Sequence, residues 1–154
     1  MTILMRFDPS NSMKIELLPE QEAYLSTKDT ICQVIRENPD SVFAFDILQD
    51  EILIGFALLH RFEPDSFFLW DYAIDWKFQN QGLGTEALKQ LIKFMHEQYG
   101  LSVMTTTYIW GNTHAKTMYE KVGFVQTDVV DEPECHEVNM IFRYPSSTGI
   151  VERV

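Results

Sequence analysis

Two glycines and a threonine stand where a predicted strand gives way to a predicted helix, and this arrangement is typical of phosphate binding. Gly82, Gly84 and Thr85 follow a β-favouring segment that ends at Asp75. The first turn of a helix carries backbone N–H groups without helical partners and the positive end of the helix dipole. Glycine lacks a Cβ atom, so the backbone approaches a pyrophosphate closely, and a threonine hydroxyl adds a donor. An ordinary turn between a strand and a helix can have the same glycines. The glycines alone therefore do not distinguish a phosphate-binding turn from an ordinary connection.

The run from Gly82 to Ala87 also satisfies G-x-G-x-x-G/A, the pattern of dinucleotide-binding folds. Those folds place an Asp or Glu about 20 residues further on, at the end of the next strand, where it binds the ribose. The next predicted strand, Val103 to Trp110, contains no carboxylate. The turn also comes midway along a short chain, after three segments typical of antiparallel strands. The sequence therefore disfavours a dinucleotide site.

The residues around the turn resemble a known family. The run from Gln79 to Gly84 (QNQGLG) is similar to the acyl-CoA pyrophosphate loop of the GNAT superfamily of N-acetyltransferases, Q/R-x-x-G-x-G/A. Downstream, Asn112 to Phe124 resembles the family segment N-x-x-A-x-x-L-Y-x-K-x-G-F, with Met118 for Leu as the only departure. The resemblance covers residues 67–144, and Glu20 to Thr27 is similar to bacterial diamine and spermidine acetyltransferases. The two motifs occur in the family's order.

The resemblance implies that acetyl-CoA (coenzyme A) is the cosubstrate and that no metal is needed. Backbone amides of residues 81–85 would bind the pyrophosphate, and Gln79 would position the start of the loop. Main-chain groups of residues 69–74 would pair with the pantetheine arm, which carries two amides and behaves like an added strand. Asn112 would bond to the pantetheine region. The implied cofactor-binding residues are Tyr72, Ala73, Ile74, Gln79, Gln81, Gly82, Leu83, Gly84, Thr85, Asn112 and Tyr119.

The implied catalytic residues are Tyr119 and Asp71. Tyr119 would protonate the departing CoA thiolate; the alternative is a helix residue that packs on the sheet. An alkylammonium has a pKa of about 10.4, so a base or a water chain must remove its proton before attack. Many relatives carry a carboxylate at the position that aligns with Trp70, whereas this chain has Asp71, and one step along a strand reverses the face. Either a β-bulge restores Asp71 to the cleft, or Asp71 lies in a supporting or dimer-surface position and water carries the proton.

The predicted acceptor is the primary amine of a small cation, with a polyamine favoured and an aminoglycoside or a protein or peptide amine as alternatives. Aromatic faces attract ammonium groups by about 0.5–2 kcal/mol each, and separated carboxylates set the spacing of the charges. The aromatic residues also fit a role in packing. A non-catalytic acyl-CoA sensor or scaffold with the same fold is the alternative function. The predicted substrate-binding residues are Glu22, Tyr24, Trp70, Asp71 and Trp110, and further candidates are Glu63, Asp65, Tyr72, Trp76 and Glu134.

The elements that position these residues alternate between strand and helix patterns. Residues 13–18 predict a first strand, 19–38 one or two helices, and 41–48 with 51–62 a hairpin. Residues 67–75, 101–110, 124–130 and 137–144 predict further strands, and 84–99 and 113–122 predict helices that end at glycines. The pattern predicts an α/β (α+β) fold, a mixed sheet of six to seven strands flanked by about four helices. The single acyltransferase domain should span residues 1–145, with a loosely ordered tail over 146–154.

The charge and composition narrow the class of partner. The chain has 154 residues and a formal net charge of −11. Such charge repels phosphate backbones and anionic lipids, so we expect no nucleic-acid or membrane partner; an acidic surface also serves solubility. Two cysteines without metal-ligand spacing imply neither a disulfide framework nor a metal site. No leader or long apolar run is evident, which predicts a cytoplasmic protein, and similar enzymes indicate a possible homodimer.

Overall fold

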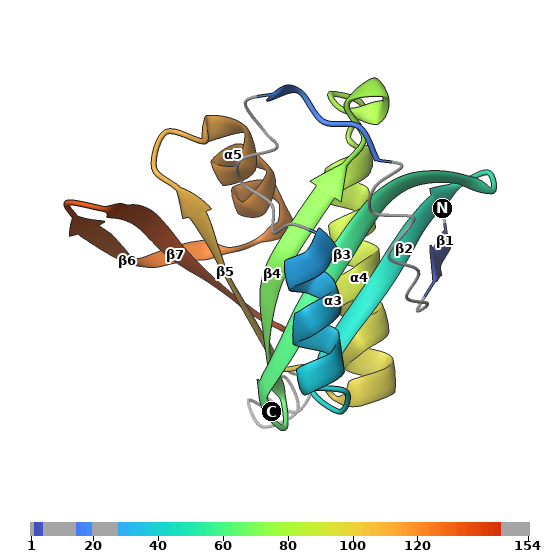
Figure 1. Cartoon of the computed structure of the whole chain (residues 1–154), viewed down its shortest axis with the longest axis horizontal. Helices are drawn as coiled ribbons and strands as arrows, with labels where there is room; N and C mark the ends of the chain where they lie inside the picture. The colour runs from blue at the N-terminus through green and yellow to red at the C-terminus, as the bar shows by residue number, and fades with distance from the viewer. Residues whose placement is uncertain (1, 5–14, 20–27, 146–154) are drawn as a thin grey trace, which may run out of the picture.

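A seven-stranded sheet forms the centre of the molecule (Figure 1). The structure, a computed structural model, describes residues 2–4, 15–19 and 28–145. The strands are β1 (Thr2–Leu4), β2 (Val42–Gln49), β3 (Ile52–Glu63), β4 (Ser66–Ile74), β5 (Val103–Ile109), β6 (Val125–Glu132) and β7 (Cys135–Arg143). The helices of the described residues are α3 (Lys28–Glu37), α4 (Leu83–Tyr99), α5 (Thr113–Val122) and the short 3-10 helix η1 (Trp76–Phe78).

The strands lie in the order β1-β2-β3-β4-β5-β7-β6. Every neighbouring pair is antiparallel except β4 and β5, which are parallel. Parallel neighbours need a crossover connection, and α4 supplies it between β4 and β5. The phosphate-binding candidate is the first turn of that crossover. The expected mixed sheet of six to seven strands is confirmed.

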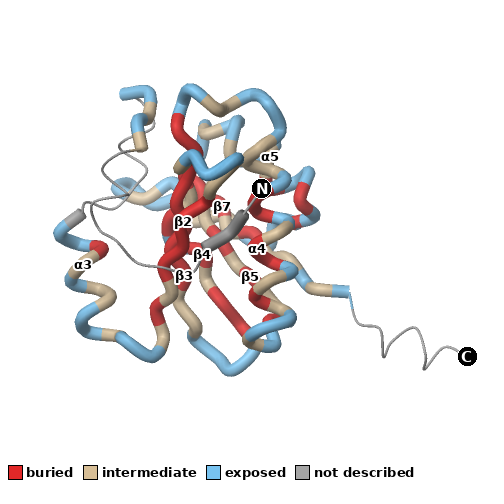
Figure 2. The backbone as a smooth tube through the Cα atoms, turned by 90° about the vertical axis from the view of Figure 1, so that its right-hand side faces the viewer, coloured by how far each residue is buried: buried red, intermediate tan, exposed pale blue. Residues whose placement is uncertain are grey.

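The helices cover both faces of the sheet and enclose apolar clusters on each. On one face, α4 packs Leu88, Leu91 and Met95 against strand residues that include Phe45 and Leu69. These α4 positions recur at helical spacing, and Gly100 ends the helix in the left-handed conformation. On the other face, Ile31 of α3 packs on β2 and β3. Figure 2 shows the buried segments gathered along β2, β3 and β4 between these layers.

The first strand was predicted at the wrong place. Residues 15–18 of the predicted strand over 13–18 have no regular structure, and the strand that pairs with β2 is Thr2–Leu4. The Glu16 backbone bonds instead to the segment after β4: its N–H donates to Asp75 Oδ2 (3.0 Å), and its carbonyl accepts from Trp76 N (2.8 Å). Pattern reasoning missed β1 because three residues are too few to show an alternation.

The remaining elements follow the sequence prediction closely. The predicted helical region over 19–38 contains α3; residues 20–27 lie outside the described residues, as does the predicted tail over 146–154. The described residues contain three α-helices, slightly fewer than the four expected. The predicted hairpin is β2–β3, and its turn residues Asp50 (φ 51°) and Glu51 (φ 68°) both have positive φ. No helix within the described ranges is long and apolar enough to cross a membrane.

Candidate active site

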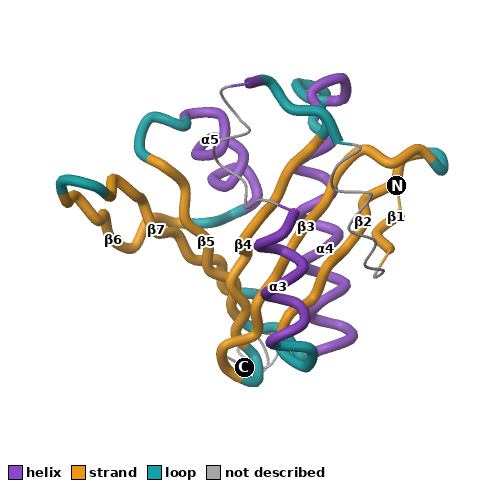
Figure 3. Tube along the Cα trace, viewed as in Figure 1, coloured by secondary structure: helices purple, strands orange, loops and turns teal. Residues whose placement is uncertain are grey.

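The sheet opens between β4 and β5, and this opening forms the main cleft. The pairing between the two strands is limited to residues 66–69 of β4 and residues 103–106 of β5. Beyond that point β4 pairs with β3 alone and β5 pairs with β7 alone, so the two strands diverge, as Figure 3 shows. The Thr106 hydroxyl donates to Leu69 O (3.1 Å) at the last shared rung. The diverging strands leave main-chain donors and acceptors on their facing edges for an extended ligand to pair with.

A β-bulge in β4 changes which side chains face the cleft. Asp71 pairs with Leu58 and Leu69 pairs with Leu59, so Trp70 is the extra residue between them. Side chains that pair across strands share a face. Leu69 and Tyr72 therefore face α4, whereas Asp71 faces the α3 side with Leu58. A bulge is present in β4, but Asp71 faces the α3 side and is not among the residues that line the cleft, where the first alternative placed it.

The glycine turn begins α4 at one end of a cleft of about 670 Å³. Gly82 is the N-cap, has a φ of +77°, and provides no side-chain cap. The first helical bond runs from Glu86 N to Gly82 O (3.1 Å), so the N–H groups of residues 83–85 have no helical partner. Gln79 Nε2 donates to Ile74 O (2.7 Å), which ties the start of the loop to the end of β4.

Tyr72 connects the strand to this turn. Its hydroxyl donates to Gly84 O (2.6 Å). A Cβ atom at Gly84 would lie 3.2 Å from Met118 Sδ and 3.4 Å from Ile74 Cγ1, so the turn packs tightly between β4 and α5. The unpaired N–H groups, the missing Cβ atoms and the open strand edges together fit the pyrophosphate and the pantetheine amides of acetyl-CoA.

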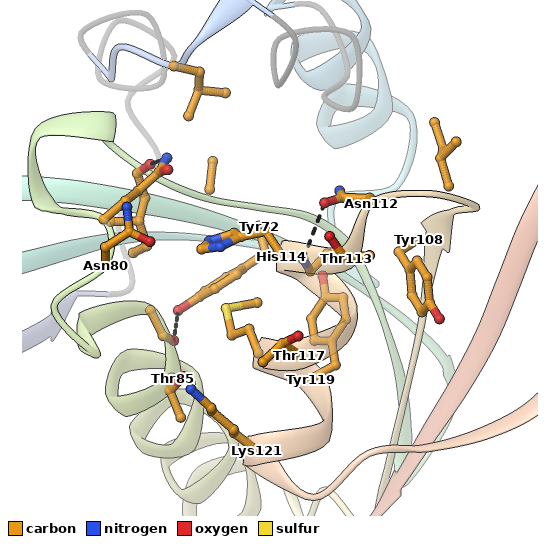
Figure 4. A pocket seen from close by; sticks show the side chains of 18 of the residues that line it. Tyr72, Asn80, Thr85, Tyr108, Asn112, Thr113, His114, Thr117, Tyr119 and Lys121 are labelled. Carbon is orange, nitrogen blue, oxygen red and sulfur yellow. Dashed lines mark hydrogen bonds between the residues drawn. The ribbon is translucent and has the colours of Figure 1, made fainter.

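Helix α5 forms the opposite wall of the cleft. Asn112 is its N-cap, and Asn112 Oδ1 accepts from Ala115 N (3.2 Å), so the Nδ2 group is the donor left for a ligand. Figure 4 shows Asn112, His114, Tyr119 and Lys121 projecting from this helix toward the cleft. Further α5 residues that line it are Thr113, Ala115, Thr117 and Met118.

Tyr119 lies buried at the inner wall of the cleft, with an exposed fraction of only 6%. Burial raises the pKa of its phenol above 10.0; the Asp71 charge adds to the rise, while the Thr106 hydroxyl opposes it. Burial, and then the Tyr119 charge, raise the pKa of Tyr72 well above its usual value. Both phenols are therefore protonated at neutral pH, which is the state that a proton donor needs.

Asp71 is 3% exposed and does not line the cleft, yet its charge influences Tyr119. The two side chains belong to opposite faces of the sheet, and the opening between β4 and β5 separates them. The Asp71 charge therefore acts on Tyr119 although only Tyr119 lines the cleft. This arrangement suits a base and an acid that act on different partners.

The structure brings most predicted cofactor residues together. Those that line the cleft are Tyr72, Ala73, Ile74, Gln79, Gly82, Gly84, Thr85, Asn112 and Tyr119. Gln81 and Leu83 do not: Gln81 Nε2 donates to Lys77 O (3.4 Å), and Leu83 packs on the cluster around Ile54. Their backbone N–H groups remain part of the turn.

The predicted acceptor-binding residues do not lie together in the cleft. Trp70 and Trp110 are exposed (38% and 62%) and lie outside the cleft lining. Glu22 and Tyr24 lie outside the described residues. Sequence reasoning assigned no role to His114 or Lys121, which line the cleft. Their spacing with Met118 (i, i+4, i+7) on the predicted helix is the signal that identifies this face. The described ranges contain no cluster of His, Cys, Asp or Glu that could hold a metal ion.

Comparisons with known proteins agree with this geometry. The sequence matches the acetyltransferase (GNAT) family over residues 8–124, and comparison with curated proteins gives no match. Among solved structures, the ribosomal-protein-S18-alanine N-acetyltransferase from Escherichia coli is 20% identical, with a TM-score of 0.73 and 92% of each chain covered. The spermidine N-acetyltransferase from Vibrio cholerae in complex with CoA and spermine is 13% identical, with a TM-score of 0.73 and 92% of this chain and 94% of that chain covered.

Ard1 from Thermoplasma volcanium is 19% identical and has a TM-score of 0.73, and the alignment covers 94% of this chain and 98% of that chain. At these identities the solved structures establish the fold alone. The family match spans most of the chain, and the cleft has the donors that the cofactor needs. The chain therefore belongs to the acetyltransferase (GNAT) family and is an acetyl-CoA-dependent N-acetyltransferase.

Proposed function

We propose that this enzyme acetylates a primary amine of a small polycation, with a polyamine such as spermidine as the favoured acceptor, by direct transfer in a ternary complex. The observation that carries the acceptor proposal is the acidic β6–β7 hairpin beside the open end of β5. Trp110 N donates to His136 O (2.9 Å), so the hairpin lies next to this exposed tryptophan. The acidic residues of the hairpin are Asp128, Asp131, Glu132, Glu134 and Glu137.

The carboxylates of the hairpin also act on the cysteine within it. Desolvation, followed by the charges of Glu137 and Glu132, raises the pKa of the Cys135 thiol. Asp131 bonds to His136 Nδ1 (2.8 Å) and Asp128 accepts from Asn139 Nδ2 (3.2 Å); Glu132 and Glu134 are exposed, as are these two aspartates. Exposed carboxylates near an indole ring attract an extended polyamine through charge and cation–π contact.

The chemistry of transfer is assigned to two residues. Acetyl-CoA, when bound, supplies an acetyl thioester with a thiolate leaving group. Asp71, on the α3 face, accepts a proton from the acceptor ammonium, the neutral nitrogen then attacks the carbonyl carbon, and the second nitrogen proton passes to solvent as the C–S bond breaks. Tyr119, on the α5 side, donates its phenolic proton to the departing sulfur, and the raised pKa keeps that proton in place until then.

A panel of amines tests the acceptor proposal. Thiol release is measured with spermidine, a monoamine, an aminoglycoside and peptides with free N-terminal amines. We expect spermidine to have the highest kcat/KM. The double variant Glu132→Gln/Glu134→Gln should raise KM for spermidine and leave the monoamine unchanged. Glu97→Gln, which removes a carboxylate far along α4, is the matched control. A higher kcat/KM for peptides would replace the polyamine with a protein amine.

The variant Asp71→Asn tests the base. We expect kcat/KM to fall by about 10²–10⁴-fold near neutral pH, the usual contribution of a positioned acid or base. The deficit should shrink as the pH approaches about 10, where the free amine no longer needs a base. The CoA dissociation constant and the melting temperature report on folding. A folded variant with the activity of the parent at every pH would assign proton removal to water.

A further inference from the structure

One residue of the cleft wall comes from a segment that the proposed chemistry does not use. Among the described residues, Leu17 lines the cleft from the N-terminal part of the chain, whereas the other lining residues lie between Tyr72 and Lys121. Leu17 belongs to the segment over residues 15–19, in which residues 15–18 have no regular structure. Such a segment keeps its place only if contacts outside any helix or strand ladder hold its backbone. The contacts of its neighbour Glu16 therefore decide where Leu17 lies.

The carboxylate of Asp75 is the first of these contacts. Asp75 is only 3% exposed, and each of its two oxygens accepts a backbone hydrogen bond. Oδ2 accepts from Glu16 N (3.0 Å), and Oδ1 accepts from Lys77 N (3.0 Å) in the short helix η1. A buried carboxylate is costly unless it is hydrogen-bonded, and these two bonds satisfy it. One side chain therefore joins the N-terminal segment to the residues that follow β4.

Trp76 holds the same residue from the other side. Its backbone N–H donates to Glu16 O (2.8 Å), and its indole Nε1 donates to Glu16 Oε2 (3.3 Å). Both main-chain polar groups of Glu16 are thus bonded to the two residues directly after β4. Figure 1 shows this segment, in blue, passing the turn that follows β4. Glu16 is fixed in place, and it fixes the adjacent Leu17.

The anchored segment lies on the face of β4 that carries Asp71. The Asp75 N–H donates to a β3 carbonyl (2.7 Å), so the pairing of β4 with β3 continues to this residue. Asp71, Ala73 and Asp75 are two residues apart, and alternate residues of a strand share a face. Ala73 pairs with a β3 residue of the cluster on the α3 side, and it also lines the cleft. Leu17 and Ala73 therefore form cleft wall on the side of the proposed base.

We propose that Asp75 is a positioning residue for the acceptor, because it holds residues 15–19 against the cleft, and that Leu17 determines which acceptors fit. The proposal rests on the placement of the acceptor beside Asp71 under the proposed function. Leu17 offers an apolar surface to the methylene chain of a slender amine and leaves no room for a branch. A fixed wall on this side also limits the orientations that the amine adopts before attack.

Two substitutions release the segment without changing the glycine turn. Asp75→Asn keeps an oxygen that accepts from Lys77 N, since Asn and Asp cap helices equally well, but it places an amide donor opposite the Glu16 N–H. Trp76→Pro removes the N–H that bonds to Glu16 O. Proline suits the first position of a helix, and Asp75 already has the extended geometry that precedes proline (φ −52°, ψ 136°). Glu16→Gln is the matched control, because it removes one negative charge and keeps both main-chain bonds.

Hydrogen exchange of the full chain measures whether the segment is held. In the parent and in Glu16→Gln, the Glu16 amide should exchange at least about tenfold more slowly than in an unstructured peptide. In Asp75→Asn and in Trp76→Pro it should exchange at least about tenfold faster than in the parent, while the amides of α4 keep their protection. A Glu16 amide without protection in the parent would overturn the anchoring, whatever the acceptor is.

Kinetics and calorimetry then test the role in the reaction. The acceptor is the amine with the highest kcat/KM in the panel described above. Asp75→Asn and Trp76→Pro should raise its KM by at least about tenfold and leave the CoA dissociation constant within about twofold. Leu17→Ala should raise kcat/KM for a branched amine relative to its unbranched isomer by about tenfold, the usual effect of methylene groups in an apolar wall. Glu16→Gln should leave both quantities near those of the parent.

The outcomes separate this inference from the proposed function. A peptide as the best acceptor would replace the polyamine, and the same variants would then be measured with that peptide. Release of the Glu16 amide without a rise in the acceptor KM would overturn the positioning role of Asp75. Equal losses of CoA affinity and of acceptor affinity would also overturn it, because the effect would then pass through the glycine turn. An unchanged preference between branched and unbranched amines in Leu17→Ala would overturn the role of Leu17.

Discussion

At the scale of single residues, Tyr119 combines two properties that rarely coincide in a packing residue. It is buried against Phe124, with 5.3 Å between ring centroids, and it also lines the cleft beside the opening of the sheet. Burial raises the pKa of its phenol, so the hydroxyl keeps its proton at neutral pH. These properties support a role as the proton donor to the leaving thiolate.

The variant Tyr119→Phe should lower turnover by about 10²–10⁴-fold and leave CoA affinity nearly unchanged. The ring and its contact with Phe124 would remain, and only the proton donor would be lost. Steady-state thiol release and calorimetry with CoA provide the two measurements. Full turnover in this variant would assign Tyr119 to packing and the leaving-group proton to solvent.

The two cleft tyrosines also predict how stability depends on pH. The pKa values of Tyr72 and Tyr119 are raised in the folded protein above 10.0, first of all by burial. Below about pH 10 both states keep these protons, so the full contribution to stability is present. Above about pH 10 the unfolded chain loses protons that the folded chain retains, and stability falls.

Melting temperatures recorded between about pH 8 and pH 11 should decline in the parent, and Tyr119→Phe should decline less steeply. The double variant Tyr72→Phe/Tyr119→Phe should decline least. Identical slopes for all three proteins would show that these phenols do not control the alkaline response.

At the scale of elements, the turn before α4 is built to leave backbone N–H groups open. Asn80 (φ 62°) and Gly82 (φ 77°) both adopt the left-handed conformation. Gln79 ties the turn to β4, and Tyr72 ties its first helical residues to the same strand. The turn is therefore held on both sides while its N–H groups face the cleft.

The variant Gly82→Val should weaken CoA binding by at least about tenfold, because a β-branched residue at positive φ distorts the turn. No atom lies within 4 Å of a Cβ at Gly82, so backbone strain rather than a clash is the cause. Asn80→Gly keeps the left-handed conformation and is the matched control. Calorimetry with CoA measures both; equal affinity in the parent and in Gly82→Val would contradict the role of the turn.

At the scale of the whole molecule, an acidic protein must bind an anionic cosubstrate and, under the proposed function, attract a cationic acceptor. The net charge is −11, yet Lys121 and the start of α4 place positive potential at the glycine-turn end of the cleft. The acidic hairpin lies at the end of β5, where β7 and β6 extend beyond the helices in Figure 1. The two charged partners would therefore bind at regions of opposite sign.

This arrangement predicts that salt affects the KM for a polyamine more strongly than the KM for a monoamine. The KM for spermidine should rise as salt increases from about 10 to 500 mM, because exposed charges are screened beyond a Debye length of about 8 Å at physiological salt. The KM for a monoamine, which carries a single charge, should change far less. Steady-state kinetics at saturating acetyl-CoA measure both; the same salt response and equal specificity constants would contradict the polyamine assignment.

The sequence by itself determined the elements that local patterns encode. The glycine turn, the helical spacing of Leu88, Leu91 and Met95, and the capping residues Asn112 and Gly123 identify the α4 and α5 region, which contributes many of the residues that line the cleft. These features are local, because capping, helix periodicity and positive φ depend on residues within one or two turns.

Only the tertiary structure decided where the strands pair and which face each side chain takes. The bulge at Trp70 arises from the register of β4 against β3, so the side of Asp71 could not be read from the alternation of β4 alone. The short strand Thr2–Leu4 pairs with residues more than forty positions away, and the cleft exists because β4 and β5 stop pairing after Leu69 and Thr106. Each of these features depends on contacts between segments far apart in the chain, which no local pattern contains.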